Sequence, residues 1–146
     1  MWLFYYIGIA LYVCGVRVAA LFSEKARAWI KGREGLLKSL EGKIPSDRKV
    51  VWMHCASLGE FEMGRPVLEA IRNDFPDKFL VLTFFSPSGY EIRKNYPGAD
   101  LVIYLPADLP GNARQFIKLL KPCLAVFVKY EFWFGYLREL HKNKVP

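Results

Sequence analysis

Four short apolar runs recur between residues 50 and 128, and they constrain the fold of this 146-residue chain more than any other feature. They lie at 50–55, 79–85, 101–105 and 124–128 and are rich in Val, Ile, Leu and Phe. None shows the alternation of polar and apolar residues that a half-exposed strand would have. Such runs are typical of strands that are buried on both faces of a parallel sheet.

Helical patterns separate these runs and complete an alternating order. They cover 66–75, 89–96, 112–120 and 132–141, and in the first of them Val67, Leu68, Ile71 and Phe75 are expected to face the sheet. Short right-handed crossovers turn such an order into a parallel sheet with helices on both faces. The sequence therefore predicts an α/β fold of Rossmann-like type.

The N-terminal segment is of a different kind, because residues 2–22 carry Arg17 as their only charge. The segment is about long enough to cross a bilayer. It has neither a basic leading region nor a convincing cleavage site, so we expect a retained anchor and not a signal peptide. A helix that spans the membrane and a monotopic helix whose arginine reaches the phosphate level both remain open. A soluble protein that buries this helix in its own core or in a partner is the disfavoured alternative, because aromatic-rich apolar runs of this length seldom serve that role.

We accordingly expect an anchor helix in residues 1–30 and a Rossmann-like domain in residues 31–146. The last residues, Lys-Val-Pro at 144–146, read as the approach to another strand. We therefore expect the sequence to be a fragment of a longer protein.

The net charge of +7 indicates an anionic partner, which could be nucleic acid, an acidic membrane surface or a phosphorylated ligand. Basic residues follow the apolar segment closely, and by the positive-inside rule they place the rest of the chain in the cytoplasm. These residues are Lys25, Arg27, Lys31, Arg33 and Lys38. They are most simply an interface with anionic lipid head groups. The adjacent anchor and the missing motifs disfavour nucleic acid.

Three cysteines, Cys14, Cys55 and Cys123, lie in apolar runs without the spacing of a zinc site or a disulfide framework. We expect all three to be small core residues. No metal site is expected.

Candidate functional residues follow the expected strands, because ligands of open parallel sheets bind beyond the carboxyl ends of the strands. In chain order they are His54, Ser57, Gly59 and Glu60; Ser86, Ser88 and Gly89; Pro106 and Asp108; and Lys129, Tyr130 and Glu131.

Glu60 is the most suggestive of these residues, because a carboxylate at the end of a strand can be aimed into the crevice as a general base. It could equally be a capping carboxylate at the start of a helix, and Glu131 leaves the same choice open. The Ser-Pro-Ser-Gly loop at 86–89 could bind phosphate or sugar oxygens, or be an ordinary helix cap. His54 is expected to be a core histidine without a catalytic triad.

The sequence lacks the motifs of several common enzyme classes. Ser57 is not in a G-x-S-x-G elbow, so a serine hydrolase is poorly supported. Neither a G-x-G-x-x-G nor a phosphate-binding G-x-x-x-x-G-K-[ST] follows any of the runs. A nicotinamide or P-loop nucleotide site is therefore not expected.

Several segments resemble, in order, the N-terminal half of the Kdo transferases, the 3-deoxy-D-manno-octulosonic acid transferases of lipopolysaccharide assembly. They are G-R-E-G at 32–35, V-W-M-H-C-A-S-L-G-E at 51–60, T-F-F-S-P-S-G at 83–89, Y-L-P-A-D at 104–108 and K-P-C-L-A-V-F-V-K-Y-E-F-W at 121–133. The resemblance implies a GT-B glycosyltransferase, with this chain as the acceptor-binding half and the donor-binding domain downstream.

The resemblance also implies a reaction and roles for residues. Such enzymes transfer Kdo from CMP-Kdo to the lipid A precursor at the cytoplasmic face of the bacterial inner membrane, with inversion and without a metal cofactor. The general base of the family corresponds to Glu60, and Glu131 would be a supporting acid. Substrate binding is expected at Ser57, Gly59, Ser86, Ser88, Gly89 and Lys129.

The sequence departs from the family pattern at one place, since Lys129 stands where many members have an acid. Two other functions remain open. One is a different membrane-associated GT-B transferase with a lipid acceptor, such as an enzyme of peptidoglycan precursors. The other is a membrane-anchored module that binds a phosphorylated ligand without chemistry.

Overall fold

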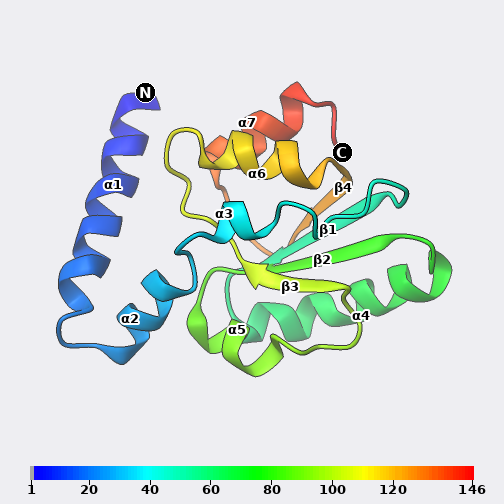
Figure 1. The fold of residues 1–146 in the computed structure, drawn as a ribbon, viewed down its shortest axis with the longest axis horizontal. Coiled ribbons are helices and arrows are strands. Elements are labelled where there is room, and N and C mark those ends of the chain that lie inside the picture. The colour runs from blue at the N-terminus through cyan, green and yellow to red at the C-terminus, as the bar shows by residue number, and fades with distance from the viewer. Residues whose placement is uncertain (1) are drawn as a thin grey trace.

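A computed structural model describes residues 2–146 and contains the expected parallel sheet. Its four strands are β1 (Val50–Cys55), β2 (Phe79–Phe84), β3 (Leu101–Tyr104) and β4 (Pro122–Phe127). All pairs are parallel, and the strand order is β3-β2-β1-β4 (Figure 1). The predicted α/β class is confirmed.

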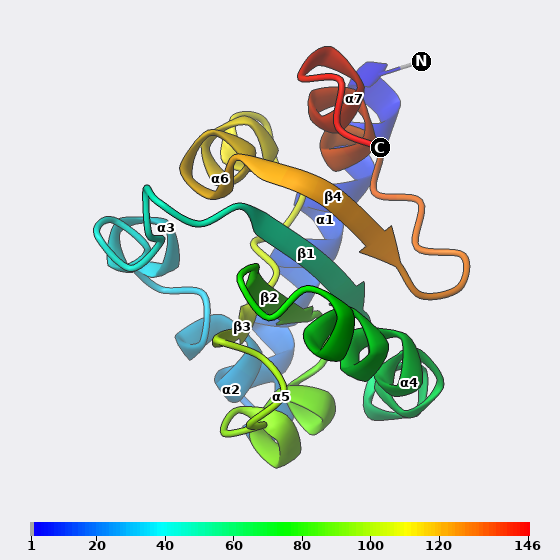
Figure 2. The same cartoon turned by 90° about the vertical axis from the view of Figure 1, so that its right-hand side faces the viewer.

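Helices cover both faces of this sheet (Figure 2). One face packs on α4 (Leu58–Asp74), with α5 (Pro87–Arg93) beside it. The other face packs on α3 (Leu36–Ser39), α6 (Asn112–Leu120) and α7 (Phe134–Lys142). Alternate residues of β1 enter the two cores, because successive side chains of a strand point to opposite faces. Trp52 lies in the core under α6 and α7, and Met53 lies in the core under α4.

The start of α4 differs from the sequence prediction. The helix begins at Leu58, directly after Ser57, and Pro66 lies inside it. Phe61, Gly64 and Leu68 form its buried face, whereas Val67 is half exposed. The prediction placed the start too late, because a proline was taken as the first-turn residue while Ser57 and Glu60 already supplied the capping signal.

Two of the three cysteines contradict the prediction that all are core residues. Cys55 is fully buried at the end of β1, but Cys14 and Cys123 are exposed. Cys14 lies on the outer face of the first helix, and Cys123 lies on β4, an edge strand of the sheet. An apolar neighbourhood in the sequence does not ensure burial at such positions.

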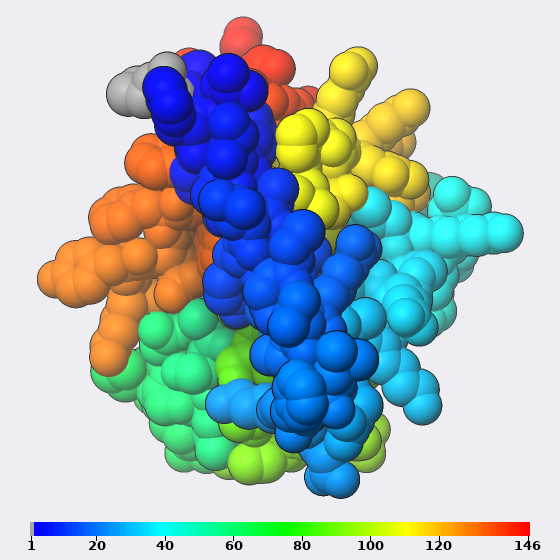
Figure 3. Space-filling model, turned by 90° about the vertical axis from the view of Figure 1, so that its left-hand side faces the viewer, coloured from blue at the N-terminus to red at the C-terminus, as the bar shows by residue number. Residues whose placement is uncertain are grey.

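The N-terminal segment forms two helices, α1 (Trp2–Ala19) and α2 (Glu24–Lys31). Helix α1 runs along one side of the domain (Figures 1 and 3). It contacts residues that follow the carboxyl ends of the strands: Phe85 after β2, and Asp108 after β3. Helix α1 therefore crosses the edge of the sheet where the candidate site residues lie.

Arg33 is not part of a lipid-facing basic surface, contrary to the sequence prediction. Its guanidinium donates to the carbonyl oxygens of Trp29, Phe85 and Leu105 and lies 3.9 Å from the centre of the Trp29 ring. Burial lowers its pKa to about 9. Arg33 thus fastens α2 to the ends of β2 and β3.

Gly135 shows how closely α7 approaches the loop after β3. Its N–H donates to Asp108 Oδ2 at 2.7 Å, and a Cβ atom here would overlap the Asp108 carboxylate. Gly135→Ala should destabilise the full-length protein by about 1–3 kcal/mol, since overpacking a buried contact forces a shift of backbone or side chain. Chemical denaturation measures this loss.

Gly59→Ala is the matched control. Gly59 also lies in a helix, but no atom stands within 4 Å of its Cβ position. Alanine there should be neutral or stabilise by up to about 1 kcal/mol, through helix propensity. Equal effects of the two substitutions would contradict the packing described for Gly135.

Candidate active site

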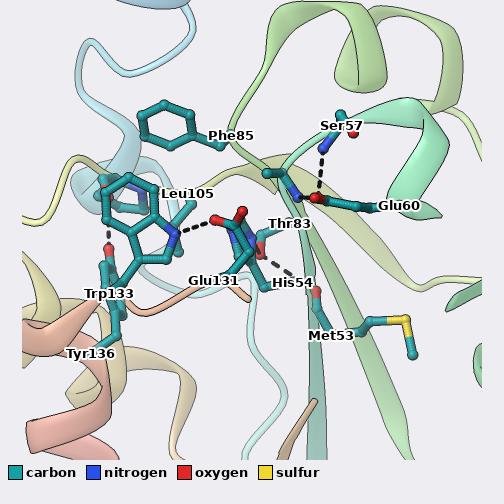
Figure 4. A network of polar contacts seen from close by, with 12 residues as sticks. Met53, His54, Ser57, Glu60, Thr83, Phe85, Leu105, Glu131, Trp133 and Tyr136 are labelled. Atoms are coloured by element: carbon teal, nitrogen blue, oxygen red, sulfur yellow. Dashed lines mark hydrogen bonds and ion pairs between the residues drawn. The ribbon is translucent and has the colours of Figure 1, made fainter. Parts of the chain in front are cut away.

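Glu60 lies in the first turn of α4, and only Ala56 and Ser57 separate this helix from β1. Its Oε2 accepts hydrogen bonds from the backbone N–H groups of Ala56, at 2.5 Å, and Ser57, at 3.1 Å (Figure 4). This is the carboxylate half of a capping box, and it satisfies N–H groups that the start of a helix leaves unpaired.

The cap does not exclude the role of general base. It engages Oε2 and fixes the orientation of the half-buried carboxylate, while Oε1 is left for another partner. A base must be held within hydrogen-bonding reach of the proton that it takes. The capping bonds supply this positioning, so the two sequence interpretations of Glu60 are compatible.

Glu131 lies in the loop between β4 and α7, and two side chains orient it. The indole Nε1 of Trp133 donates to Glu131 Oε2 at 2.7 Å, and His54 Nε2 lies 3.7 Å from the same oxygen. The His54 side chain is the main cause that lowers the pKa of Glu131, and the bond from Trp133 adds to it. Glu131 is therefore held as an anion at the end of β4.

His54 is fully buried, as a core histidine should be, but it also belongs to a polar chain through the sheet. Its Nδ1 lies 2.8 Å from Thr83 Oγ1 on β2, and that oxygen accepts from Trp52 Nε1 at 2.9 Å. The other ring nitrogen, Nε2, makes no hydrogen bond within the described residues and lies 3.7 Å from Glu131 Oε2. The sequence did not reveal this partner, because Glu131 is far from His54 along the chain.

The two carboxylates converge near the end of β1. Burial raises the pKa of the Cys55 thiol to about 12, and the charges of Glu60 and Glu131 both contribute to the rise. Cys55 is the last residue of β1, so both carboxylates lie near the carboxyl end of this strand. Figure 4 shows them on either side of the strand.

The loop after β2 joins the same edge. The N–H of Ser86 donates to Ala56 O at 2.8 Å, which ties this loop to the turn before α4. Ser86 caps α5, and its Oγ lies 2.8 Å from Ser88 Oγ. A Cβ atom on Gly89 would lie 2.5 Å from the Phe84 ring, so this glycine permits close packing of α5. These residues have structural roles, and their substrate binding remains a prediction.

The remaining predicted binding residues are open to solvent. Gly59 is exposed in the first turn of α4, and Ser57 beside it is half buried. Lys129 is exposed directly after β4 and has a φ of 65°, an uncommon conformation for a residue with a side chain. All three lie at the edge that carries Glu60 and Glu131, and their contacts with substrate stay predicted.

From the sequence, Asp108 is only a candidate functional residue after the third strand, and the sequence does not predict the structural role that Asp108 has. It is buried, and its Oδ2 accepts from the Tyr5 hydroxyl and from Gly135 N–H, both at 2.7 Å. Burial raises its pKa. Asp108 therefore joins α1 and α7 to the edge of the sheet and does not face a substrate.

Residues 2–146 contain no cluster of side chains suited to bind a metal ion. No group of three His, Cys, Asp or Glu side chains in that range comes together as a metal site requires. The metal-free mechanism itself stays a prediction.

Thr83 is the central hydroxyl of the polar chain, so its removal tests the chain. Thr83→Val should destabilise the full-length protein by about 1–3 kcal/mol, because it leaves the Trp52 indole and His54 Nδ1 buried without a partner. Thr83→Ser keeps the hydroxyl and should lose about 1 kcal/mol for the missing methyl group. Denaturation midpoints compare the two, and a serine variant as unstable as the valine variant would argue against the hydrogen bonds.

Glu131 should make stability depend on pH. Because its pKa in the folded protein lies below the ordinary 4.5, the wild type gains stability from it above pH 4.5 and loses it as the pH falls through the folded value. The stability difference between wild type and Glu131→Gln should therefore shrink in acid. The exposed Glu41→Gln is the control, and a difference that stays constant with pH would contradict the interaction with His54.

Comparison with known proteins identifies the family of this site. The family profile described as 3-deoxy-D-manno-octulosonic-acid transferase (kdotransferase) matches residues 29–146. The matched range contains the whole sheet and both carboxylates.

Curated relatives agree with the profile, and each of them is named 3-deoxy-D-manno-octulosonic acid transferase. A protein of Haemophilus influenzae is 25% identical over the whole chain, which covers 35% of that relative. A protein of Aquifex aeolicus is 34% identical over 57% of the chain and 23% of its own length, and one of Chlamydia muridarum is 31% identical over 68% and 24%. The chain thus spans about a third or less of these relatives, and it belongs to the Kdo transferase family.

Proposed function

We propose that this chain is the acceptor-side half of an inverting glycosyltransferase that moves Kdo from CMP-Kdo to the lipid A precursor. One observation carries the proposal: Glu60 is held by two backbone N–H groups through Oε2, with Oε1 left over at the carboxyl edge of the sheet. The family and the names of its relatives support the transferred sugar.

The chemistry needs one base on this side of the reaction. Glu60 Oε1 takes the proton of the acceptor hydroxyl while the hydroxyl oxygen bonds to the anomeric carbon of Kdo. The bond from that carbon to the CMP phosphate breaks on the opposite face, and CMP leaves with the electron pair, which inverts the configuration. No bound metal is required in this scheme.

Glu131 supports the base as a fixed anion. Its carboxylate accepts a hydrogen bond from Trp133 and lies 3.7 Å from His54 Nε2, which supports a fixed orientation near the end of β1. We assign it to orienting the acceptor. Hydroxyl and backbone groups at the same edge bind the sugar and phosphate oxygens of the acceptor; these residues are Ser57, Gly59, Ser86, Ser88, Gly89 and Lys129.

The donor belongs to the other half of a GT-B enzyme, so CMP-Kdo would bind mainly to a domain outside this chain. The acceptor is a phosphorylated glycolipid, which fits both the net charge of +7 and the apolar helix α1. We place the protein at the cytoplasmic face of the bacterial inner membrane, with no role for nucleic acid.

Glu60→Gln tests the base in the full-length protein with CMP-Kdo and a lipid A precursor. Sugar transfer should fall by a factor of about 100 or more, the size expected for a lost general base. Acceptor binding should be unchanged, because glutamine also serves in a capping box and keeps the turn intact. Transfer of labelled sugar and binding of labelled acceptor are measured in parallel.

Glu62→Gln is the matched control on the same helix, since Glu62 only pairs with Arg65 and Arg93. It should transfer sugar at close to the wild-type rate. Near-normal transfer by Glu60→Gln would show that Glu60 is only a cap. A wild-type protein that binds the acceptor but transfers no Kdo would contradict the assigned reaction.

A further inference from the structure

Helix α1 has one face that packs on the domain. The residues of this face recur every three or four positions, which is the spacing of one helix face, and they are Tyr5, Ile9, Val13 and Val16. Val13 is the most buried of them and packs in a cluster with Trp29 and Ala107.

The opposite face of α1 is apolar and uncovered. Leu3, Phe4, Leu11 and Val18 have exposed fractions of 69%, 77%, 67% and 62%, and Phe22 just after the helix reaches 86%. A helix on the surface of a soluble protein presents polar residues on this side. A contiguous apolar face of this kind marks a surface that is covered by a membrane or by another protein.

The packing fixes the direction of α1 relative to the domain. The Tyr5 hydroxyl donates to the buried Asp108, and the centre of the Tyr5 ring lies 5.3 Å from that of Phe134. About two helical turns later, the Tyr12 ring lies 6.0 Å from the Phe85 ring. Contacts therefore extend along most of the 18-residue helix, as its course over the surface in Figure 3 also shows. These contacts favour a fixed orientation of α1 relative to the domain.

This rigid attachment argues against a helix that spans the bilayer. A spanning α1 would carry the domain surface beside it into the hydrocarbon region. That surface includes Lys38 and Glu34, which line a groove of about 540 Å³ between α1 and the domain, and Ser86 and Lys25 in a second groove of about 310 Å³. Charged and irregular backbone groups of this kind are excluded from contact with lipid chains.

We propose that α1 lies in the plane of one membrane leaflet, with its outer face in the acyl region and the domain on the water side. Charge favours an anionic lipid surface over a protein as the partner, because basic residues outnumber acidic ones in the two grooves beside α1. Arg17 and Lys38 line one groove together with Glu34, and Lys25 lines the other. An apolar face between basic residues is typical of helices that bind the interface of anionic membranes.

The arrangement brings the edge of the sheet to the membrane surface. Helix α1 contacts the loops that follow β2 and β3, so an amphiphile in the same leaflet would reach this edge without leaving the lipid. The orientation of α1 does not depend on which reaction the site performs.

Fluorescence quenching in vesicles tests the orientation. The full-length protein would carry Phe4→Cys, Leu11→Cys or Val18→Cys, one at a time, in a background in which Cys14 and Cys123 are replaced by serine and the buried Cys55 is kept. Each cysteine bears a polarity-sensitive dye, and the vesicles are three parts phosphatidylethanolamine to one part phosphatidylglycerol. Lipids with a spin label at a shallow or a deep position report the depth of each dye.

An in-plane helix predicts the same shallow depth at all three positions. The control is a separate variant in which only Cys14 is replaced by serine, so that the dye sits on the native Cys123, which is exposed at the start of β4; this dye should be quenched by neither lipid. A depth that is greatest at position 11 and small at 4 and 18 would show a spanning helix and overturn the proposal. Dyes that no lipid quenches would show a protein partner or a second copy on this face, which also overturns it.

Discussion

The central place of β1 between β2 and β4 is the constraint on which the rest of the structure depends. Parallel pairing on both sides sets His54 opposite Thr83 on β2 and opposite Phe127 on β4. It also brings the loops that follow these strands to one edge. Glu60, Ser86 and Glu131, which are far apart in the sequence, meet there because their strands end together. The polar chain from Trp52 to Glu131 runs through the same pairing.

Glu60 has a structural role as a cap, and in the proposed function it is also the general base. The capping hydrogen bonds engage Oε2 of the Glu60 carboxylate and restrict rotation of the side chain. A general base needs a side chain that is held in place in this way. Glu131 is restrained in a different way, by a histidine from inside the sheet and an indole from its own loop. Two carboxylates with different supports can therefore serve as base and as orienting anion at the same edge.

Much of this arrangement could be predicted from the sequence, and the failures have physical causes. Runs of Val, Ile, Leu and Phe predicted the strands, because a buried parallel strand must be apolar on both faces. The strand-end rule predicted that Glu60 and Glu131 lie at the carboxyl edge of the sheet, and their roles there stay predicted. The sequence did not reveal the contact of His54 with Glu131 or the burial of Arg33, because both depend on partners brought together only by the fold. A basic residue in a basic stretch was taken for a surface charge, although aromatic rings and carbonyl oxygens enclose it.

The position of the acceptor hydroxyl relative to Glu60 is the most direct test of the central claim. A structure of the full-length protein in a lipid nanodisc, with the lipid A precursor bound, would give this position. The hydroxyl oxygen should lie about 3 Å from Glu60 Oε1 while Oε2 keeps its bonds to the backbone. An acceptor bound elsewhere, with its hydroxyl out of reach of Oε1, would contradict the assignment of Glu60 as the base.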